Sequence, residues 1–149
     1  MFNQIAQTIP YQQITVEGFE ISIKRLDLVH PHISGNKFFK LKYNLLAARQ
    51  QGYKKLLTFG GAYSNHIAAT TYAAQLFGFE SLGIIRGEEL ACKPLNTTLN
   101  TAQQFGMQLQ FVSREAYRQE QNPAYLAQLQ QDYPDYYVIP EGGTNPLAI

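Results

Sequence analysis

The sequence predicts an α/β fold, in which an open, twisted parallel sheet of about four strands carries flanking helices and follows an N-terminal β-hairpin. Short apolar runs recur roughly every 25–30 residues, at 54–59, 81–85, 107–112 and 136–139, and helical patterns lie between them. This spacing is typical of βαβ units, because parallel strands need a crossover connection. Before these units, residues 12–28 alternate apolar and polar side chains with the two-residue period of strands.

The N-terminal hairpin is expected to turn at Glu17-Gly18. Apolar side chains alternate with polar ones on both sides of this pair, as in a two-stranded antiparallel ribbon. The apolar set is Ile14, Val16, Phe19, Ile21 and Ile23. Residues 29–32 then form an extended lead, because the ring of Pro31 keeps His30 out of helical geometry.

The first helix is expected to begin at the turn of residues 34–36 and to run to about Gln51. Apolar residues at three- and four-residue steps predict its buried face, namely Phe38, Leu41, Leu45 and Ala48. The side-chain oxygens of Ser34 and Asn36 are expected to accept free N–H groups of the first turn. Gly52 is expected to end the helix.

A second helix is expected to follow the glycine-containing stretch at 60–66 and to run to about Phe77, where Gly78 supplies the stop. Its predicted buried stripe consists of Ala69, Tyr72, Ala73 and Leu76. The end of the glycine-containing stretch is therefore expected at the N-terminus of this helix.

The later part of the chain repeats the pattern. A third helix is expected to close at Gly106, with a buried stripe of Leu95, Leu99, Ala102 and Phe105. Ser113 is expected to cap the polar segment 114–131, which Asn122-Pro123 interrupts.

Composition excludes some classes of function. The chain has 149 residues, 45% of them hydrophobic, which is enough for one core. A formal charge of +1 gives no reason to expect nucleic acid or an anionic membrane as partner. Cys92 is the only cysteine, which excludes an intrachain disulfide. With no signal peptide and no long apolar stretch in the sequence, we expect a cytoplasmic protein.

Three lysines lie close together at the start of the first helix, and one of them differs from the others. Lys40 and Lys42 are expected on a solvated helix face. Lys37 lies at the helix N-terminus, where a cation opposes the helix macrodipole. A partly desolvated lysine at such a position could lose its proton near neutral pH and attack a carbonyl group.

Ligands of open parallel sheets bind beyond the carboxyl ends of the strands. The loops expected there are small, polar and glycine-containing, at 60–66, 86–87, 113–114 and 141–145. Each of these loops alone could be an ordinary turn. Their joint placement at one edge favours a binding site.

The loop at 60–66 leads from a strand into a helix N-terminus, where free N–H groups favour an anion such as a carboxylate. It matches neither a Rossmann Gly-x-Gly-x-x-Gly motif nor a Walker A loop. Ser64 or Asn65 could be simply the helix N-cap. His66, in the first turn, is expected to be neutral because the helix N-terminus disfavours its cation.

His30 and His32 are spaced so that both point to one side of an extended segment. Two histidines alone make a poor metal site. We expect no metal, and a role for these histidines in lining the lysine turn.

Two stretches together carry a family resemblance. Ser-Gly-Asn-Lys-Phe-Phe-Lys-Leu at 34–41 and Thr-Phe-Gly-Gly-Ala-Tyr-Ser-Asn-His at 58–66 resemble the pyridoxal-phosphate enzymes grouped as 1-aminocyclopropane-1-carboxylate (ACC) deaminases and D-cysteine desulfhydrases. These enzymes have the tryptophan-synthase-β fold type, also called fold type II. The resemblance extends through residues 139–145 and so covers nearly the whole chain.

The resemblance implies a site. Lys37 would hold pyridoxal 5'-phosphate and later move the substrate Cα proton, and Asn65 would hydrogen-bond the cofactor's ring oxygen. The turn of Ser64, Asn65 and His66 would take the substrate carboxylate. Ser64 is also the family's candidate nucleophile or base. His66 stands where the deaminase branch typically has Gln, which favours a D-cysteine-like substrate, cleaved by β-elimination, over ACC.

The resemblance also implies that the chain is the N-terminal half of a longer protein. Residues 1–45 would be part of an incomplete large domain and residues 46–149 the small βα domain. No phosphate loop and no partner of the pyridine nitrogen can be located in the sequence, so little turnover is expected, and the full-length form would be a homodimer. The alternatives are a non-catalytic βα module that binds a small anion or a protein partner and, with less support, a flavodoxin-like nucleotide binder.

Overall fold

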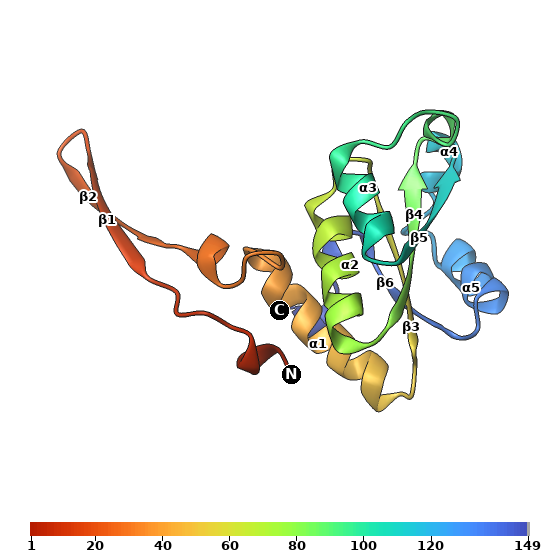
Figure 1. Cartoon of the computed structure of the whole chain (residues 1–149), viewed down its shortest axis with the longest axis horizontal. Coiled ribbons are helices and arrows are strands. Elements are labelled where there is room, and N and C mark those ends of the chain that lie inside the picture. The colour runs from red at the N-terminus through yellow and green to blue at the C-terminus, as the bar shows by residue number, and fades with distance from the viewer. Residues whose placement is uncertain (149) are drawn as a thin grey trace.

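The computed structural model describes residues 1–148, and its centre is a four-stranded parallel sheet (Figure 1). The strands are β3 (Lys55–Gly60), β4 (Glu80–Arg86), β5 (Met107–Val112) and β6 (Tyr136–Ile139), in the order β5-β4-β3-β6. The predicted fold class, a parallel sheet of about four strands with an N-terminal hairpin, is confirmed.

Helices cover both faces of the sheet and make three layers (Figure 1). One face carries α1 (Asn36–Gln50), α2 (Asn65–Phe77) and α3 (Thr97–Gln104). The opposite face carries α4 (Arg114–Tyr117) and α5 (Pro123–Asp132). Short 3₁₀ turns connect these elements, at Phe2–Gln4, Leu26–Leu28, Glu88–Leu90, Glu141–Gly143 and Pro146–Ala148.

The start of α1 differs from the prediction. Its N-cap is Gly35, with φ +61°, and no side chain makes a capping hydrogen bond. The oxygens of Ser34 and Asn36 therefore do not cap this helix as expected. The end of the helix is as predicted, since Gly52 takes a left-handed φ of +82° and its N–H donates to the carbonyl of Arg49.

The stripe predicted for α2 is only partly correct. Leu76 is 44% exposed, whereas Thr70, Thr71 and Ala74 are buried. The reason is that α2 packs against the sheet, α1 and α3 together, so its buried surface is wider than one stripe. In α3 the buried residues are Leu99 and Ala102, while Leu95 and Phe105 lie just outside its ends.

The cap and the interruption predicted for the later polar segment are confirmed. Ser113 Oγ accepts the N–H of Ala116 at 3.1 Å at the start of α4. Asn122 caps α5, whose first residue is Pro123, and so divides the polar segment as expected.

The N-terminal hairpin consists of β1 (Tyr11–Val16) and β2 (Phe19–Lys24), paired antiparallel. Glu17 and Gly18 both have positive φ, +50° and +83°, as tight two-residue hairpin turns require. In Figure 1 the hairpin projects away from the body of the molecule. Among residues 1–148, no helix has the length and apolar character that a membrane span requires.

Candidate functional site

The two sequence motifs meet at one cavity between the first turns of α1 and α2. Its volume is about 260 Å³. Its lining combines His32, Ser34, Gly35, Asn36, Lys37, Asn65, Ala68 and Ala69. Lys37 and Asn65 are 28 residues apart in the sequence, and the packing of α1 against α2 brings them to the same space.

Lys37 is half-buried, and its amine contacts the backbone near the end of the chain. Its Nζ donates a hydrogen bond to the carbonyl oxygen of Gly142 at 3.2 Å. Burial lowers the pKa of Lys37, and the neighbouring charge of Lys40 lowers it further, while Glu141 opposes both. The amine therefore gives up its proton more readily than an ordinary lysine, in the direction predicted.

The other two lysines of the cluster have different surroundings. Lys40 Nζ donates to Thr144 Oγ1 at 2.7 Å, in the loop after β6. The expectation that Lys40 lies on a solvated helix face is therefore only partly correct. Lys42 is partly buried, with Nζ 4.9 Å from the centroid of the Tyr43 ring. Of the three, Lys37 alone lines the cavity.

Ser64 is the N-cap of α2. Its Oγ accepts the N–H of Ile67 at 3.3 Å, which confirms the capping alternative for this residue. Asn65 is exposed at the first position of the helix and lines the cavity. A catalytic role for Ser64 and a cofactor contact for Asn65 stay predictions.

Gly60 allows the cap to form, because a Cβ at this position would lie 2.5 Å from Ile67 Cγ1 and 2.9 Å from Ser64 Oγ. We predict that Gly60→Ala destabilises the chain by about 1–3 kcal/mol, the usual cost of overpacking. Gly61→Ala is the control, since its nearest contact would be Arg86 at 3.7 Å. Urea unfolding of both variants measures the difference, and equal stabilities would contradict the close packing at this turn.

His66 is buried and belongs to a chain of hydrogen bonds. Thr58 Oγ1 donates to the carbonyl oxygen of Ile139 at 2.9 Å and lies 2.8 Å from His66 Nε2. Because the single hydroxyl proton of Thr58 goes to Ile139, Nε2 must carry the proton that Thr58 accepts. Nδ1 of His66 is then an acceptor, and it has no partner within residues 1–148.

The neutrality predicted for His66 is confirmed, but its main cause is different. Burial, followed by the charges of Lys37 and Lys40, lowers the pKa of His66 to about 3. The cause expected from the sequence was the helix N-terminus. The imidazole is therefore neutral throughout the physiological range.

The turn at Gly142 and Gly143 contacts both α1 and α2. Both glycines have positive φ, +68° and +71°. A Cβ at Gly143 would lie 3.4 Å from both His66 Cε1 and Lys40 Cβ. This turn lies against α1 and α2 together, and its Gly142 carbonyl accepts the hydrogen bond from Lys37.

The loop at 141–145 was expected at the site from the sequence, but several contacts of this loop and of β6 were not. Asn145 Nδ2 donates to Oδ1 of the buried Asn44 at 2.7 Å, and Thr58 bonds to Ile139. The sequence held two signals for these contacts: Thr58 is a polar residue inside the apolar run of β3, and Asn44 is one on the buried face of α1. The partners of Thr58 and Asn44 could not be predicted, because both contacts are long-range.

The two histidines before α1 have structural surroundings. His30 Nδ1 accepts the N–H groups of His32 and Ile33, each at 3.1 Å, and His32 stacks on Tyr72 with ring centroids 4.3 Å apart. His32 also lines the cavity, as expected. In the part of the chain that the structure describes, no group of three or more His, Cys, Asp or Glu residues could hold a metal ion.

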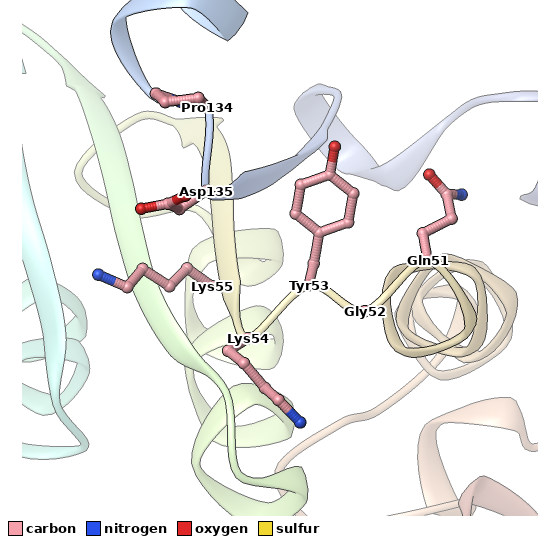
Figure 2. A pocket seen from close by; sticks show the side chains of 7 residues that line it. All are labelled: Gln51, Gly52, Tyr53, Lys54, Lys55, Pro134 and Asp135. Carbon is pink, nitrogen blue, oxygen red and sulfur yellow. The ribbon is translucent and has the colours of Figure 1, made fainter.

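A second cavity, of about 450 Å³, lies at the opposite edge of the sheet (Figure 2). It is lined by Gln51, Gly52, Tyr53, Lys54, Lys55, Pro134 and Asp135, at the amino ends of β3 and β6. Ligands of open parallel sheets bind at the other edge. The cavity beside Lys37 is therefore the better candidate despite its smaller volume.

Comparisons with known proteins agree with the sequence resemblance. No protein-family model matches the chain. A Thermotoga maritima protein provisionally named as an ACC deaminase is 36% identical over 133 residues, 88% of this chain and 42% of that protein. The Arabidopsis thaliana bifunctional D-cysteine desulfhydrase/ACC deaminase, named as mitochondrial, is 31% identical over 138 residues, 88% of this chain and 34% of that protein.

A third relative is named for a different reaction. The nocardicin C-9' epimerase of Nocardia uniformis is 31% identical over 147 residues, 95% of this chain and 45% of that protein. Among solved structures, an ACC deaminase homologue has a TM-score of 0.76 and 28% identity, covering 97% of this chain and 45% of that one.

The chain spans less than half the length of these relatives, between 34% and 45%. Similarity covers nearly all of the chain, and the fold agrees with that of the ACC deaminase homologue. By sequence and by fold, the chain is similar to ACC deaminases and D-cysteine desulfhydrases over nearly all of its own length.

Proposed function

We propose that the chain provides the lysine-bearing part of a pyridoxal-phosphate-dependent deaminase or lyase that acts on a small amino acid. One observation carries the proposal: Lys37, whose pKa is lowered, shares a cavity with Asn65. The names of the relatives favour ACC deamination or β-elimination from a D-cysteine-like substrate. His66 at the position after Asn65 favours the D-cysteine-like substrate.

The residues of the cavity fit the reactive end of the cofactor. The aldehyde of pyridoxal phosphate needs an amine that can be deprotonated, and Lys37 meets this condition. The ring oxygen of the cofactor needs a hydrogen-bond donor, and the exposed amide of Asn65 can supply one. The phosphate and the pyridine nitrogen have no assigned partner among residues 1–148, so these residues fit only part of the group.

When bound, the cofactor would supply an electron sink for the carbanion formed at the substrate Cα. The chain's own residues would position the substrate and move its protons. We propose that the Lys37 amine takes the Cα proton, since a neutral amine can act as a base. Ser64, at the first turn of α2, is the proposed nucleophile or base of the ring-opening reaction.

We propose that Ser64, Asn65 and His66 take the substrate. The free N–H groups of the first turn of α2 are suited to its carboxylate. His66 is buried and is not among the residues that line the cavity, so its proposed part is to position the turn of Ser64 and Asn65 through its bond to Thr58.

Several further expectations are proposals of the same kind. Residues 1–45 would form part of a larger domain and residues 46–149 the small domain, and the complete protein would be a homodimer. A chain of this length is expected to bind the cofactor weakly and to turn over little substrate. The proposed location is the cytoplasm, although the Arabidopsis relative is named as mitochondrial.

Reductive trapping tests the proposal. The purified chain is incubated with pyridoxal phosphate, reduced with borohydride and mapped by peptide mass spectrometry. We expect one dominant adduct, on Lys37, because a deprotonated amine reacts with an aldehyde and an ammonium does not. The adduct should be lost in Lys37→Ala and kept in Lys42→Ala, since Lys42 does not line the cavity.

The same experiment separates the proposal from its main alternative, a non-catalytic βα module that binds a small anion or a protein partner. Labelling spread evenly over Lys40, Lys42, Lys54 and Lys55, with no excess on Lys37, would contradict cofactor binding and favour that alternative.

A further inference from the structure

The loop of residues 141–145, after β6, runs along one face of α1. Figure 1 shows the end of the chain beside this helix, and α1 packs against the 3₁₀ turns Glu141–Gly143 and Pro146–Ala148. Three side chains at three- and four-residue steps along α1 bond to the loop in chain order. Lys37 bonds to Gly142, Lys40 to Thr144, and Asn44 to Asn145. The position of the loop therefore depends on α1, and the Lys37 amine contacts its middle.

The most buried of these contacts is a pair of amides. Asn44 is fully buried on a helix face that is otherwise apolar. Its Oδ1 accepts from Asn145 Nδ2 at 2.7 Å, and its Nδ2 donates to the carbonyl of Lys40 at 2.7 Å. A buried amide group without a partner is costly, so the folded chain holds Asn145 against Asn44.

The other two contacts with α1 are weaker anchors. Lys40 and Thr144 bond through side chains that solvent reaches, and water competes for both groups. Lys37 is only half-buried and bonds to a backbone carbonyl. At the start of the loop, Tyr117 Oη donates to Glu141 Oε1 at 2.7 Å. The amide pair is therefore the contact that fixes the loop on α1.

The middle of the loop covers the Lys37 amine. Gly142 has φ +68°, and its carbonyl oxygen accepts from Lys37 Nζ at 3.2 Å. A Cβ at Gly142 would lie 3.5 Å from the same nitrogen, so the backbone closes one side of the amine and contributes to its burial. A neutral amine that donates one N–H to this carbonyl still has its lone pair free to attack an aldehyde carbon.

We propose that Asn145 is a positioning residue for Lys37. Through Asn44 it docks the loop on α1, and the docked loop keeps the carbonyl of Gly142 against the Lys37 amine. The amide pair breaks the apolar pattern of the buried face of α1, and such local exceptions occur where residues serve a site. A fully bonded polar pair also fixes one arrangement, which an apolar pair of the same size would not do. The catalytic meaning of this role rests on the proposed function of Lys37.

Titratable side chains surround the Lys37 amine from several elements. Lys40 lies on α1, Glu141 on the loop, His66 on α2 and His32 before α1. Release of the loop would remove part of the burial, which lowers the pKa of Lys37, and would move Glu141, which raises it. Because burial is the larger cause, the pKa of Lys37 should return upward toward that of an ordinary lysine.

Competitive acylation of the 149-residue chain over a pH series, read on the Lys37 peptide, tests the proposal. In Asn145→Ala we expect Lys37 to become reactive at a higher pH than in the wild-type chain, closer to that of the urea-unfolded chain. Leu99→Ala is the control for lost stability, because Leu99 is buried in a cluster that contains no residue of α1 or of the loop. It should leave the Lys37 profile unchanged. An Asn145→Ala profile equal to that of the wild-type chain would overturn the proposal.

A double-mutant cycle tests whether the effect passes through Asn44. Asn44→Ala and Asn145→Ala should each shift the Lys37 profile upward, and the double variant should shift it no further than either, because both changes remove the same contact. Additive shifts would contradict action through the pair.

Hydrogen exchange read by mass spectrometry gives a second measurement on the same variants. The amides of residues 141–147 should exchange faster in Asn145→Ala than in the wild-type chain, because the loop is no longer docked. Faster exchange with an unchanged Lys37 profile would show that the docked loop does not act on Lys37, and would overturn the proposal.

Trapping with pyridoxal phosphate separates this proposal from the proposed function. If the wild-type chain forms no dominant adduct on Lys37 while Asn145→Ala still shifts the acylation profile, the proposed function fails and the positioning of the amine by the loop stands. If the adduct forms and the profile does not shift, the positioning role alone fails.

Discussion

Acidification is expected to destabilise the folded chain progressively as the pH falls from about 6.5 toward 3, with His66 as the largest single cause. Burial holds the pKa of His66 at about 3 in the folded chain, whereas an unfolded histidine titrates near 6.5. Below about pH 6.5 the unfolded chain therefore binds a proton that the folded chain rejects. A difference of about 3.5 pKa units corresponds to about 4–5 kcal/mol of stability, fully present above pH 6.5 and lost by about pH 3.

Chemical unfolding at a series of pH values measures this effect. His66→Gln should flatten the loss of stability between pH 6.5 and 4, even if it lowers stability at pH 7, because glutamine does not titrate. His32→Gln is the control, since His32 is exposed. If wild type and His66→Gln lost stability in parallel, the burial of a neutral His66 would be contradicted. His30, whose pKa burial also lowers, adds a loss in the same direction.

Replacing Thr58 by valine is expected to cost about 2–4 kcal/mol of unfolding free energy. The hydroxyl of Thr58 accepts from His66 Nε2 and donates to the carbonyl of Ile139. Valine has nearly the same shape, so it leaves no cavity, but it removes one partner from each of two buried polar groups. Leaving a buried polar group without a partner costs about 1–3 kcal/mol.

Thr58→Ser separates the hydrogen bonds from the packing. Serine keeps the hydroxyl and loses one methyl group, so it should cost only about 1 kcal/mol. Urea unfolding at pH 7 compares the two variants. If Thr58→Ser proved as destabilising as Thr58→Val, packing would explain the site and the hydrogen-bonded chain would not be needed.

The fold could be predicted largely from local patterns. β5 and β6 have the same bounds as the apolar runs predicted for them, because turn residues border both runs. The predicted burial of Leu76 was wrong. The prediction assumed that one stripe of α2 is packed, whereas α2 contacts the sheet and two helices. The capping expected from Ser34 and Asn36 failed because Gly35 itself forms the N-cap of α1.

Residues of the candidate site could be predicted where they belong to a short sequence motif. Lys37 and Asn65 each follow a turn at a helix start, and their placement on one cavity agrees with the expectation that the two motifs face each other. The carbonyl of Gly142 and the hydroxyl of Thr58 were missed, because their partners lie 105 and 8 residues away in the sequence. Those contacts exist only after the sheet has assembled.

The central claim is that burial and neighbouring charge make the amine of Lys37 chemically distinct. Competitive acylation at a series of pH values, read by peptide mass spectrometry, measures the pH at which Lys37 becomes reactive. The same residue in the urea-unfolded chain is the reference. The lowered pKa predicts that Lys37 becomes reactive at a lower pH in the folded chain than in the unfolded one. An equal or higher pH in the folded chain would contradict the claim, and with it the proposed role of Lys37.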